Sequence, residues 1–234
     1  MKPKPYRTLA LQQIIYIAAL ALVVMSVSGC EITENSSYDE DISPLVEQLR
    51  DPDPTTRSQA ADALVDMGTP AVPVLISELG GSWSYEVETS ASGVLARIGK
   101  PAVPALIEAL DNKDVITRHN AAMALAEMRG AAGAAVPALI ERLDDKILLV
   151  RSTTAFALVR IGAETRTSEV VLGLLDAMDD ESLAPYIESY FFDMADAATF
   201  SLLGARNHKD QHIRERARYM LGRLQPQFNL QDIR

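Results

Sequence analysis

Three histidines are the side chains of this chain best suited to metal or acid–base chemistry: His119, His208 and His212. His208 and His212 stand four residues apart, a spacing that places two metal ligands on one face of a helix. Two imidazoles alone hold a metal weakly, and no pattern for a third ligand accompanies them. We therefore expect solvated histidines at these two positions, and we expect neither a metal nor a cofactor.

Motifs of the common catalytic sites are also missing from the sequence. It contains no Gly-rich phosphate-binding loop and no serine in a nucleophile-elbow context. No catalytic residue is predicted, and the chain is not expected to be an enzyme. The 234 residues carry a net charge of −10, so the phosphates of a nucleic acid would meet a repulsive field. Nucleic acid is therefore excluded as a partner.

Cys30 is the only cysteine, and it stands at the end of an apolar N-terminal segment. Three basic residues precede a run that is almost wholly apolar over residues 14–27, a pattern typical of an export signal. The run ends in Val27-Ser28-Gly29-Cys30, which resembles the lipobox of bacterial lipoproteins. The resemblance implies cleavage before Cys30 and a lipid anchor on its sulfur.

A lipidated Cys30 predicts where the folded part of the protein resides. The protein would be anchored in the cell envelope, at the periplasmic face or the outer membrane if the source is a diderm bacterium. A single-pass N-terminal anchor that is not cleaved is the alternative, because residues 9–27 are about long enough to cross a bilayer. A mature domain without cysteine suits an oxidising compartment outside the cytoplasm.

Composition divides the chain into four parts. Residues 1–29 are the predicted signal peptide, and residues 30–41 are an acidic tether with too little apolar surface to fold alone. Residues 42–225 form the predicted folded domain, and residues 226–234 form a short tail. Aromatic residues make up only 6% of the chain while Ala and Leu are plentiful, which favours close-packed helices over sheets.

An internal repeat builds the folded domain. Apolar residues at i, i+3, i+4 and i+7, which share one face of a helix, recur at steps of 30, 31, 33 and 35 residues. Three copies carry Ala-Val-Pro at residues 71–73, 102–104 and 135–137, and proline is tolerated in the first turn of a helix. The copies of this first helix begin at Ile42, Val72, Val103, Val136 and Val171.

A second helix is expected after each first helix, beyond an acidic turn. An aspartate four residues before an arginine could cap the helix and form an ion pair with that arginine. Arg151 occupies the matching position of its own repeat, but no aspartate stands four residues before it. The predicted structural residues are Asp53, Arg57, Asp114, Arg118, Arg151, Asp210 and Arg214. Left-handed glycine caps are expected at Gly68, Gly99 and Gly162, and at Gly130 in the third repeat.

These residues resemble the HEAT repeat, in the short bacterial form described in phycobilin lyases. The resemblance covers residues 43–162 well, weakens over residues 170–195, and leaves a last repeat in which only the second helix is clear. A period of this length is also the signature of a stacked solenoid. The expected fold is all-α, an α–α superhelix of about six antiparallel helix pairs with atypical terminal pairs.

The resemblance implies that the second helices line the concave side of the solenoid, where such proteins bind partners. We call the arginines that recur near the start of second helices the arginine column and count positions onward from it. Positions 3, 6, 7 and 10 are apolar or small and should be packed, so positions 2, 5 and 9 should face outward. Met123 and Phe156 would then be exposed apolar residues, although burial between neighbouring helices is the alternative. The predicted partner-binding residues are Asn120, Met123, Glu127, Thr153, Phe156, Arg160, Arg216 and Tyr219.

These features favour a non-catalytic scaffold that binds one or more proteins. Two alternatives remain, namely an enzyme or chaperone related to the bilin lyases and a structural protein of envelope assembly. Export argues against a lyase, because phycobiliprotein assembly is cytoplasmic. A HEAT-type hydroxylase, which uses His-Glu pairs to hold iron, is excluded because no histidine here is followed by glutamate.

Overall fold

The computed structural model describes residues 36–81, 89–165 and 168–224. The chain divides into two parts, Met1–Asp39 and Glu40–Arg234, and the second part holds the repeats. The predicted signal peptide, Cys30 and the predicted tail lie outside the described residues.

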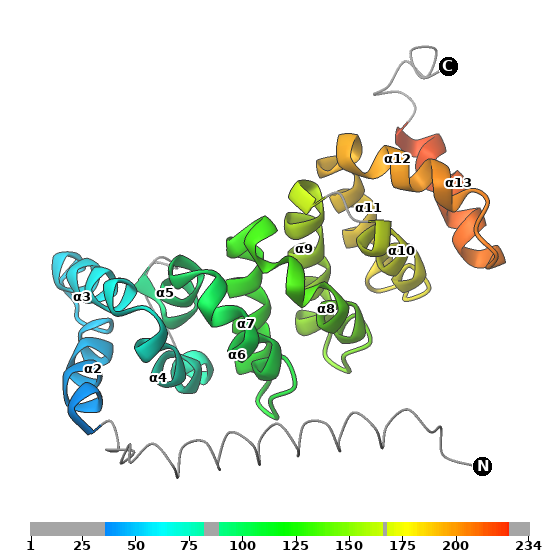
Figure 1. Cartoon of the computed structure of the whole chain (residues 1–234). Helices are drawn as coiled ribbons and strands as arrows, with labels where there is room; N and C mark the ends of the chain where they lie inside the picture. The colour runs from blue at the N-terminus through cyan, green and yellow to red at the C-terminus, as the bar shows by residue number, and fades with distance from the viewer. Residues whose placement is uncertain (1–35, 82–88, 166–167, 225–234) are drawn as a thin grey trace, which may run out of the picture. The chain divides into compact units, whose positions relative to one another are not determined.

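Every regular element that the structure describes is a helix (Figure 1). The α-helices are α2 (Ser36–Gln48), α3 (Pro54–Met67), α4 (Val72–Ser77), α5 (Ala91–Ile98), α6 (Val103–Ala109), α7 (Val115–Met128), α8 (Val136–Arg142), α9 (Leu148–Thr165), α10 (Ser168–Ala177), α11 (Ala184–Asp193), α12 (Ala195–Ala205) and α13 (Gln211–Leu224). Short 3-10 helices stand beside several of them: η1 (Thr69–Ala71), η2 (Glu78–Gly80), η4 (Lys100–Ala102) and η5 (Arg129–Ala135).

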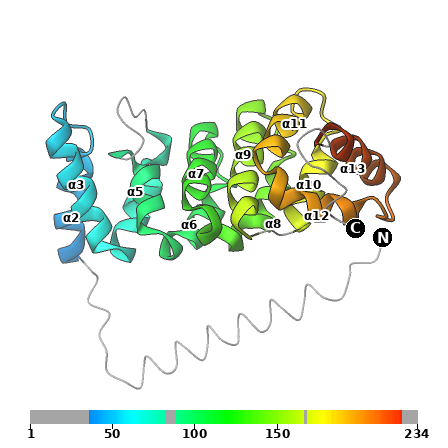
Figure 2. The ribbon, with the colours of Figure 1, turned by 90° about the horizontal axis from the view of Figure 1, so that it is seen from above.

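The helices alternate between two layers along the chain (Figure 2). In one layer α3, α5, α7, α9, α11 and α13 each pack against the next helix of the series. In the other layer α4 packs against α6, α8 against α10, and α10 against α12. The described residues thus hold six successive helix pairs, from α2/α3 to α12/α13, which confirms the predicted α–α superhelix.

The helices start where capping chemistry places them. The Asp53 carboxylate precedes α3 and accepts hydrogen bonds from the amides of Thr55 and Thr56, each at 3.3 Å. The Asp114 carboxylate precedes α7 and accepts from the Thr117 amide at 2.7 Å. Proline stands in the first two positions of α4, α6 and α8, where its missing N–H removes no helical bond.

The ends of the second helices differ from expectation in two repeats. Gly68 and Gly99 follow α3 and α5 with φ of 66° and 77°, a region that glycine enters without steric cost. In the third repeat Arg129, not Gly130, takes this position, with φ 51° and ψ −132°. Gly162 ends no helix, since it is buried within α9, where a Cβ would come within 2.8 Å of a valine side chain of α10. The predicted glycine caps are therefore wrong at Gly130 and Gly162.

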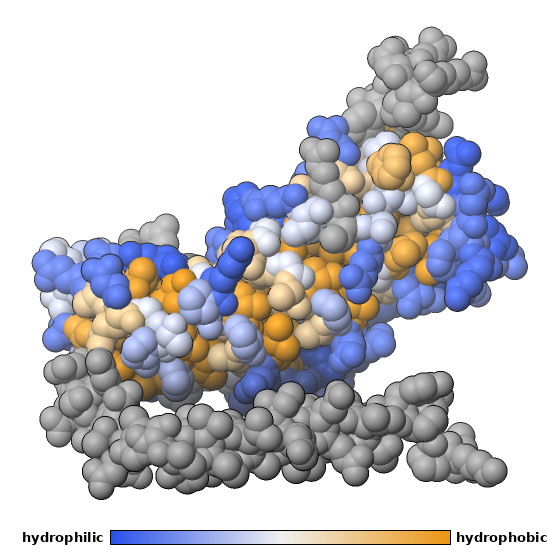
Figure 3. Space-filling view, viewed as in Figure 1, coloured by the Kyte–Doolittle hydropathy of each residue, from blue (hydrophilic) through white to orange (hydrophobic). Residues whose placement is uncertain are grey.

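Both ends of the predicted folded domain also depart from expectation. Helix α2 begins at Ser36, inside the predicted tether, so residues 36–41 are helical. Helix α12 contacts α10 and α13, and it also contacts α9, the second helix two pairs earlier, beyond the adjacent pair. Hydrophilic residues cover the end at α13 (Figure 3), as expected of a terminal repeat that stacks on one neighbour only.

One continuous apolar core joins the described repeats. The leucines at the second position (i+3) of the repeated tetrad are fully buried in four first helices: Leu75, Leu106, Leu139 and Leu174. Alanines of the second helices, such as Ala121 and Ala157, are fully buried against them and allow close helix contacts. The stretch Val115–Arg142 is long and apolar enough to cross a membrane by length and composition. It comprises α7, η5 and α8, and most of its apolar side chains belong to this core.

Candidate functional site

The second helices α7, α9, α11 and α13 present a row of partly exposed side chains, which we call the aromatic strip: Met123, Phe156, Tyr190, Phe192 and Tyr219. Phe156 of α9 and Tyr190 of α11 belong to adjacent repeats. Their ring centroids lie 5.9 Å apart and their planes are tilted by 53°, a geometry in which aromatic pairs attract. The Arg160 guanidinium lies 5.6 Å from the Phe156 centroid. The structure therefore brings Phe156 and Arg160 together with an aromatic residue that the sequence did not single out.

Ion pairs join neighbouring second helices, and one of them, Glu127–Arg160, borders the aromatic strip. Arg160 Nη2 lies 3.3 Å from the Glu127 carboxylate, and Arg97 Nη2 lies 2.5 Å from that of Asp62. These side chains remain partly or largely exposed, so each pair contributes at most about 1 kcal/mol. The pairs thus contribute little to the stability of the fold.

Tyr219 extends the strip onto the last second helix. Its side chain is 47% exposed, and its hydroxyl donates to Glu188 Oε1 at 3.0 Å. This hydrogen bond raises the pKa of Tyr219 above its ordinary range. Arg223 lies 5.8 Å from the centroid of the Phe192 ring. Tyr190 and Phe192 belong to the degenerate fifth repeat, where the sequence offers no arginine from which positions could be counted.

Position 2 of the second helices faces a neighbouring repeat instead of solvent. Thr153 is only 6% exposed, so its predicted outward orientation is wrong. Asn120 donates through Nδ2 to the carbonyl oxygen of Leu79 at 2.6 Å, and Arg216 donates to that of Leu175 at 2.9 Å. Arg216 also pairs with an aspartate of the α10–α11 turn. These three residues connect adjacent repeats and are set apart from the strip.

His119 is a further connection between repeats. Its Nδ1 lies 2.8 Å from Thr153 Oγ1, and that hydroxyl donates its own proton to the Leu149 carbonyl at 2.8 Å. The imidazole must therefore carry its proton on Nδ1 and donate it to Thr153. Burial lowers the pKa of His119 from its ordinary value of 6.5, which favours the neutral ring.

The arginine column binds the turns that precede it. Each arginine donates from Nη1 to backbone carbonyl oxygens five or six residues earlier, at 2.8 to 3.2 Å: Arg57, Arg118, Arg151 and Arg214. Asp210 accepts from the amides of His212 and Ile213. Hydrogen bonds from helix-start amides are the main reason why the pKa values of Asp53, Asp114 and Asp210 are lowered. The predicted i, i+4 ion pair is thus replaced at Arg118 and Arg214 by bonds to the turn.

Two of these arginines also bind the turn of the next repeat. Arg118 donates through Nε and Nη2 to the two carboxylate oxygens of Asp145, at 2.7 and 3.1 Å, and both side chains are only 5% exposed. Burial alone would raise the pKa of Asp145, but the bonds from Arg118 and from the Ile147 amide lower it. Arg151 Nε lies 2.7 Å from the Asp180 carboxylate in the following repeat. Arg118 and Arg151 therefore fasten the turns of the third, fourth and fifth repeats to one another.

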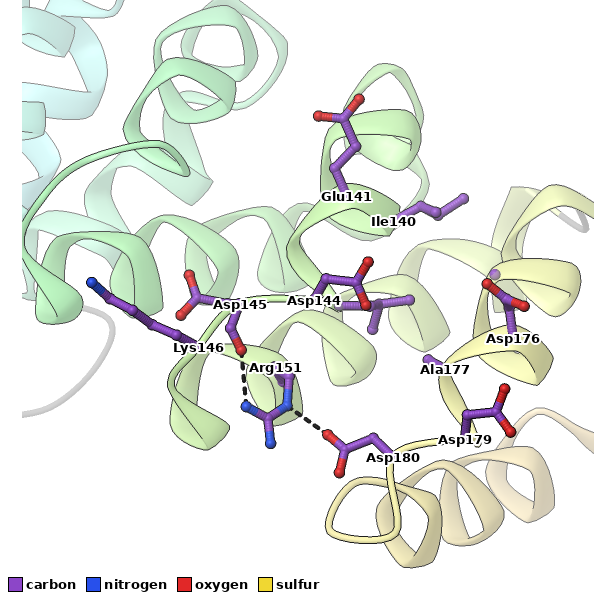
Figure 4. A pocket seen from close by; sticks show the side chains of 12 residues that line it. Ile140, Glu141, Asp144, Asp145, Lys146, Arg151, Asp176, Ala177, Asp179 and Asp180 are labelled. Atoms are coloured by element: carbon purple, nitrogen blue, oxygen red, sulfur yellow. Dashed lines mark hydrogen bonds and ion pairs between the residues drawn. The ribbon is translucent and has the colours of Figure 1, made fainter.

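The turns of the fourth and fifth repeats enclose a groove of about 560 Å³ (Figure 4). We call it the turn groove, and its lining residues are Ile140, Glu141, Leu143, Asp144, Asp145, Lys146, Arg151, Gly173, Asp176, Ala177, Asp179 and Asp180. Figure 4 shows Arg151 between the Asp145 carbonyl and the Asp180 carboxylate. The side chains of Glu141, Asp144 and Asp176 are exposed. The acidic turn residues were visible in the sequence, but their convergence depends on how the repeats stack.

The histidines that suggested metal chemistry have ordinary surroundings. His208 Nδ1 accepts a hydrogen bond from the Asp210 amide at 3.2 Å, and the His212 amide donates to the Asp210 carboxylate at 2.8 Å. Within the part of the chain that the structure describes, no three His, Cys, Asp or Glu side chains are placed to hold a metal ion. His208 lies in the loop before α13, and His212 lies in the first turn of that helix.

Comparison with known proteins gives the following matches. The family model for HEAT repeats matches residues 72–159 and 103–186. No curated protein matches the chain significantly. A chain of a solved structure of Kap95p with RanGDP shares 16% identity, with a TM-score of 0.46; the match covers 81% of this chain and 31% of that one.

Two smaller proteins match over nearly their whole length. Computationally designed armadillo repeat proteins for modular peptide recognition share 19% identity over 76% of this chain and 98% of theirs, with a TM-score of 0.39. The CpcE–CpcF complex of phycocyanin lyase from Nostoc sp. PCC7120 shares 19% identity over 76% of this chain and 96% of the matched chain, with a TM-score of 0.37. The matching family model and the alternating helix layers together show that residues 72–186 of this chain are HEAT repeats.

Proposed function

We propose that this protein is a non-catalytic scaffold that binds another protein along the aromatic strip, and that a lipid on Cys30 anchors it in the cell envelope. The contact between Phe156 and Tyr190 is the observation that supports binding most directly. Two large rings from adjacent repeats pack against the edge of the core and remain partly exposed. Aromatic and arginine side chains dominate the energetics of protein interfaces, and Arg160 lies over the Phe156 ring of this pair.

The extent of the strip suits a protein segment. It crosses four successive second helices, α7 to α13, and packed helices lie about 10 Å apart. Its length is therefore about 30 Å, which an extended segment of roughly nine residues would span. Flanking ion pairs such as Glu127–Arg160 would form the polar rim that surrounds the apolar centre of an interface.

Partner recovery from native envelopes tests the binding surface. Tyr190→Ser removes a ring at the centre of the strip, whereas Phe200→Ser removes an aromatic side chain that is 86% exposed on α12, outside the strip. Loss of a central interface aromatic costs about 2 kcal/mol or more, so we expect Tyr190→Ser to weaken partner binding about thirtyfold. Phe200→Ser should bind as the unmodified protein does. Equal recovery with both variants would show that the strip is not the binding surface.

Fractionation of a Cys30→Ala variant tests the anchor. Without the thiol no lipid can be attached, so the protein should leave the membrane fraction. The unmodified protein should show the mass of a lipidated cysteine at its mature N-terminus. Continued membrane attachment of the variant, together with an uncleaved and unlipidated N-terminus in the unmodified protein, would instead establish a single-pass anchor.

A further inference from the structure

We propose that the turn groove is a second docking surface, which receives a basic segment of another protein. The groove lies between the α8–α9 and α10–α11 turns, at the ends of helices and apart from the outward positions that carry the aromatic strip. The proposal therefore does not depend on the strip being a binding surface. It rests on the balance of charge in the groove, on its apolar floor and on exposed leucines beside it.

Half of the charged side chains that line the groove are already engaged in ion pairs. Arginines hold three of the lining carboxylates: Asp145 pairs with Arg118, Asp179 with Arg216, and Asp180 with Arg151. The carboxylates of Glu141, Asp144 and Asp176 form no ion pair or hydrogen bond with any side chain or amide that the structure describes, and neither does the ammonium group of Lys146. Three free anions against one free cation leave a groove that attracts positive charge.

The floor of the groove favours a long cationic side chain. Ile140, Leu143 and Ala177 supply apolar surface beneath the carboxylates. Lysine and arginine bury an aliphatic stem on apolar surface while the charged head stays at a polar rim. The groove volume of about 560 Å³ lies in the range that accommodates several side-chain groups of a ligand. An isolated metal ion fits less well, since no group of three ligating side chains converges among the described residues.

Exposed leucines adjoin the groove at the start of α9. Leu148 and Leu149 are 39% and 45% exposed. Leu148 precedes Arg151, a lining residue, by three positions, so the two side chains share one side of the helix. Exposed apolar residues beside a charged groove indicate a protein partner that carries both apolar and basic residues. The net charge of −10 would steer such a partner toward this protein and repel anionic lipid headgroups.

Peptide binding to the full chain in detergent micelles tests the proposal. The probe is a fluorescent twelve-residue peptide that alternates lysine and leucine, and fluorescence anisotropy measures its dissociation constant. The triple variant Glu141→Gln, Asp144→Asn, Asp176→Asn should weaken binding at least about tenfold, and Leu148→Ser about threefold. Raising the salt concentration from about 50 mM to about 300 mM should weaken binding to the unmodified protein.

A matched triple variant removes the same charge elsewhere: Asp66→Asn, Glu108→Gln and Asp196→Asn, at exposed residues of α3, α6 and α12. It should change the affinity less than about twofold, because surface charges far from a site act weakly through salt. Both triple variants should melt as the unmodified protein does, since the replaced side chains are exposed. Equal weakening by the two triples, equal binding of a glutamate–leucine peptide, or no binding of the lysine–leucine peptide would overturn the proposal. The Tyr190→Ser variant should bind this peptide normally, which separates the groove from the strip.

Discussion

Arg129 adopts a backbone conformation that glycine adopts in the two preceding repeats. Its φ of 51° and ψ of −132° are close to those of Gly68 and Gly99. Glycine adopts this conformation without strain because it has no Cβ. A side chain in this region costs roughly 1 to 3 kcal/mol. The ion pair between Arg129 and Glu164, at 3.6 Å between exposed groups, offsets little of this destabilisation.

Replacement of Arg129 by glycine should therefore stabilise the protein. We expect the free energy of unfolding to rise by about 1 kcal/mol, because the removed strain exceeds the added flexibility of the unfolded chain. Denaturant unfolding would measure the change. Gly99→Ala is the converse control and should destabilise by a similar amount. A glycine variant that is less stable than the unmodified protein would show that the arginine side chain matters more than its backbone strain.

His119 makes stability depend on pH near neutrality. Burial lowers its pKa in the folded state below the ordinary value of 6.5, so the unfolded chain binds the proton more readily. The contribution of neutral His119 to the free energy of unfolding should be fully present above about pH 6.5. It should be lost as the pH falls through the pKa of His119 in the folded state. Denaturant unfolding at about pH 7.5 and about pH 5.5 would measure the decline. His119→Asn keeps a donor toward Thr153 without titrating, and it should lose less stability over this interval; an equal loss would assign the effect to other groups.

At the scale of the helices, sequence periodicity predicted where the first helices begin. The starts of α4, α6 and α8 at Val72, Val103 and Val136 follow from the apolar tetrad and the prolines, because both act within one turn of chain. Helix caps at Asp53 and Asp114 are equally local. Local patterns of this kind depend on neighbours in sequence, which is why they could be read without a structure.

The contacts between repeats could not be predicted in the same way. Asn120 reaches a carbonyl 41 residues earlier, and Arg118 reaches a carboxylate 27 residues later. Such partners depend on the register in which neighbouring repeats stack, and register changes with the length of each turn. The buried orientation of Thr153, the pairing of Phe156 with Tyr190 and the turn groove all arise from this stacking.

The bidentate contact between Arg118 and Asp145 should be the strongest electrostatic connection between two helix pairs. Asp145→Asn leaves a guanidinium that is 5% exposed without its counter-charge, so we expect a loss of about 3 kcal/mol in the free energy of unfolding. Asp144→Asn is the matched control: the neighbouring side chain is exposed, and its loss should change stability by less than about 0.5 kcal/mol. Thermal melting of both variants would measure the difference. Equal stability of the two variants would show that the contact does not fasten the repeats.

At the scale of the repeat-bearing part of the chain, the fold separates stability from binding. The first helices and the arginine column hold the repeats in register, and the Arg118 side chain, which bonds its own turn and Asp145, is buried. The outward positions of the second helices remain free to vary in chemistry because they carry little of the core. This division explains how a regular solenoid can display an irregular surface such as the aromatic strip.

A crosslinking profile along the solenoid is the measurement that decides between a binding face and an ordinary surface. Photoreactive residues would replace Met123, Glu127 and Tyr219 on the second helices, and Glu108, Glu169 and Phe200 on the first helices, one at a time in native envelopes. We expect one protein partner to crosslink to the three second-helix positions and not to the three first-helix positions. Crosslinks distributed evenly over both sets, or confined to the first helices, would contradict a partner that binds along the aromatic strip.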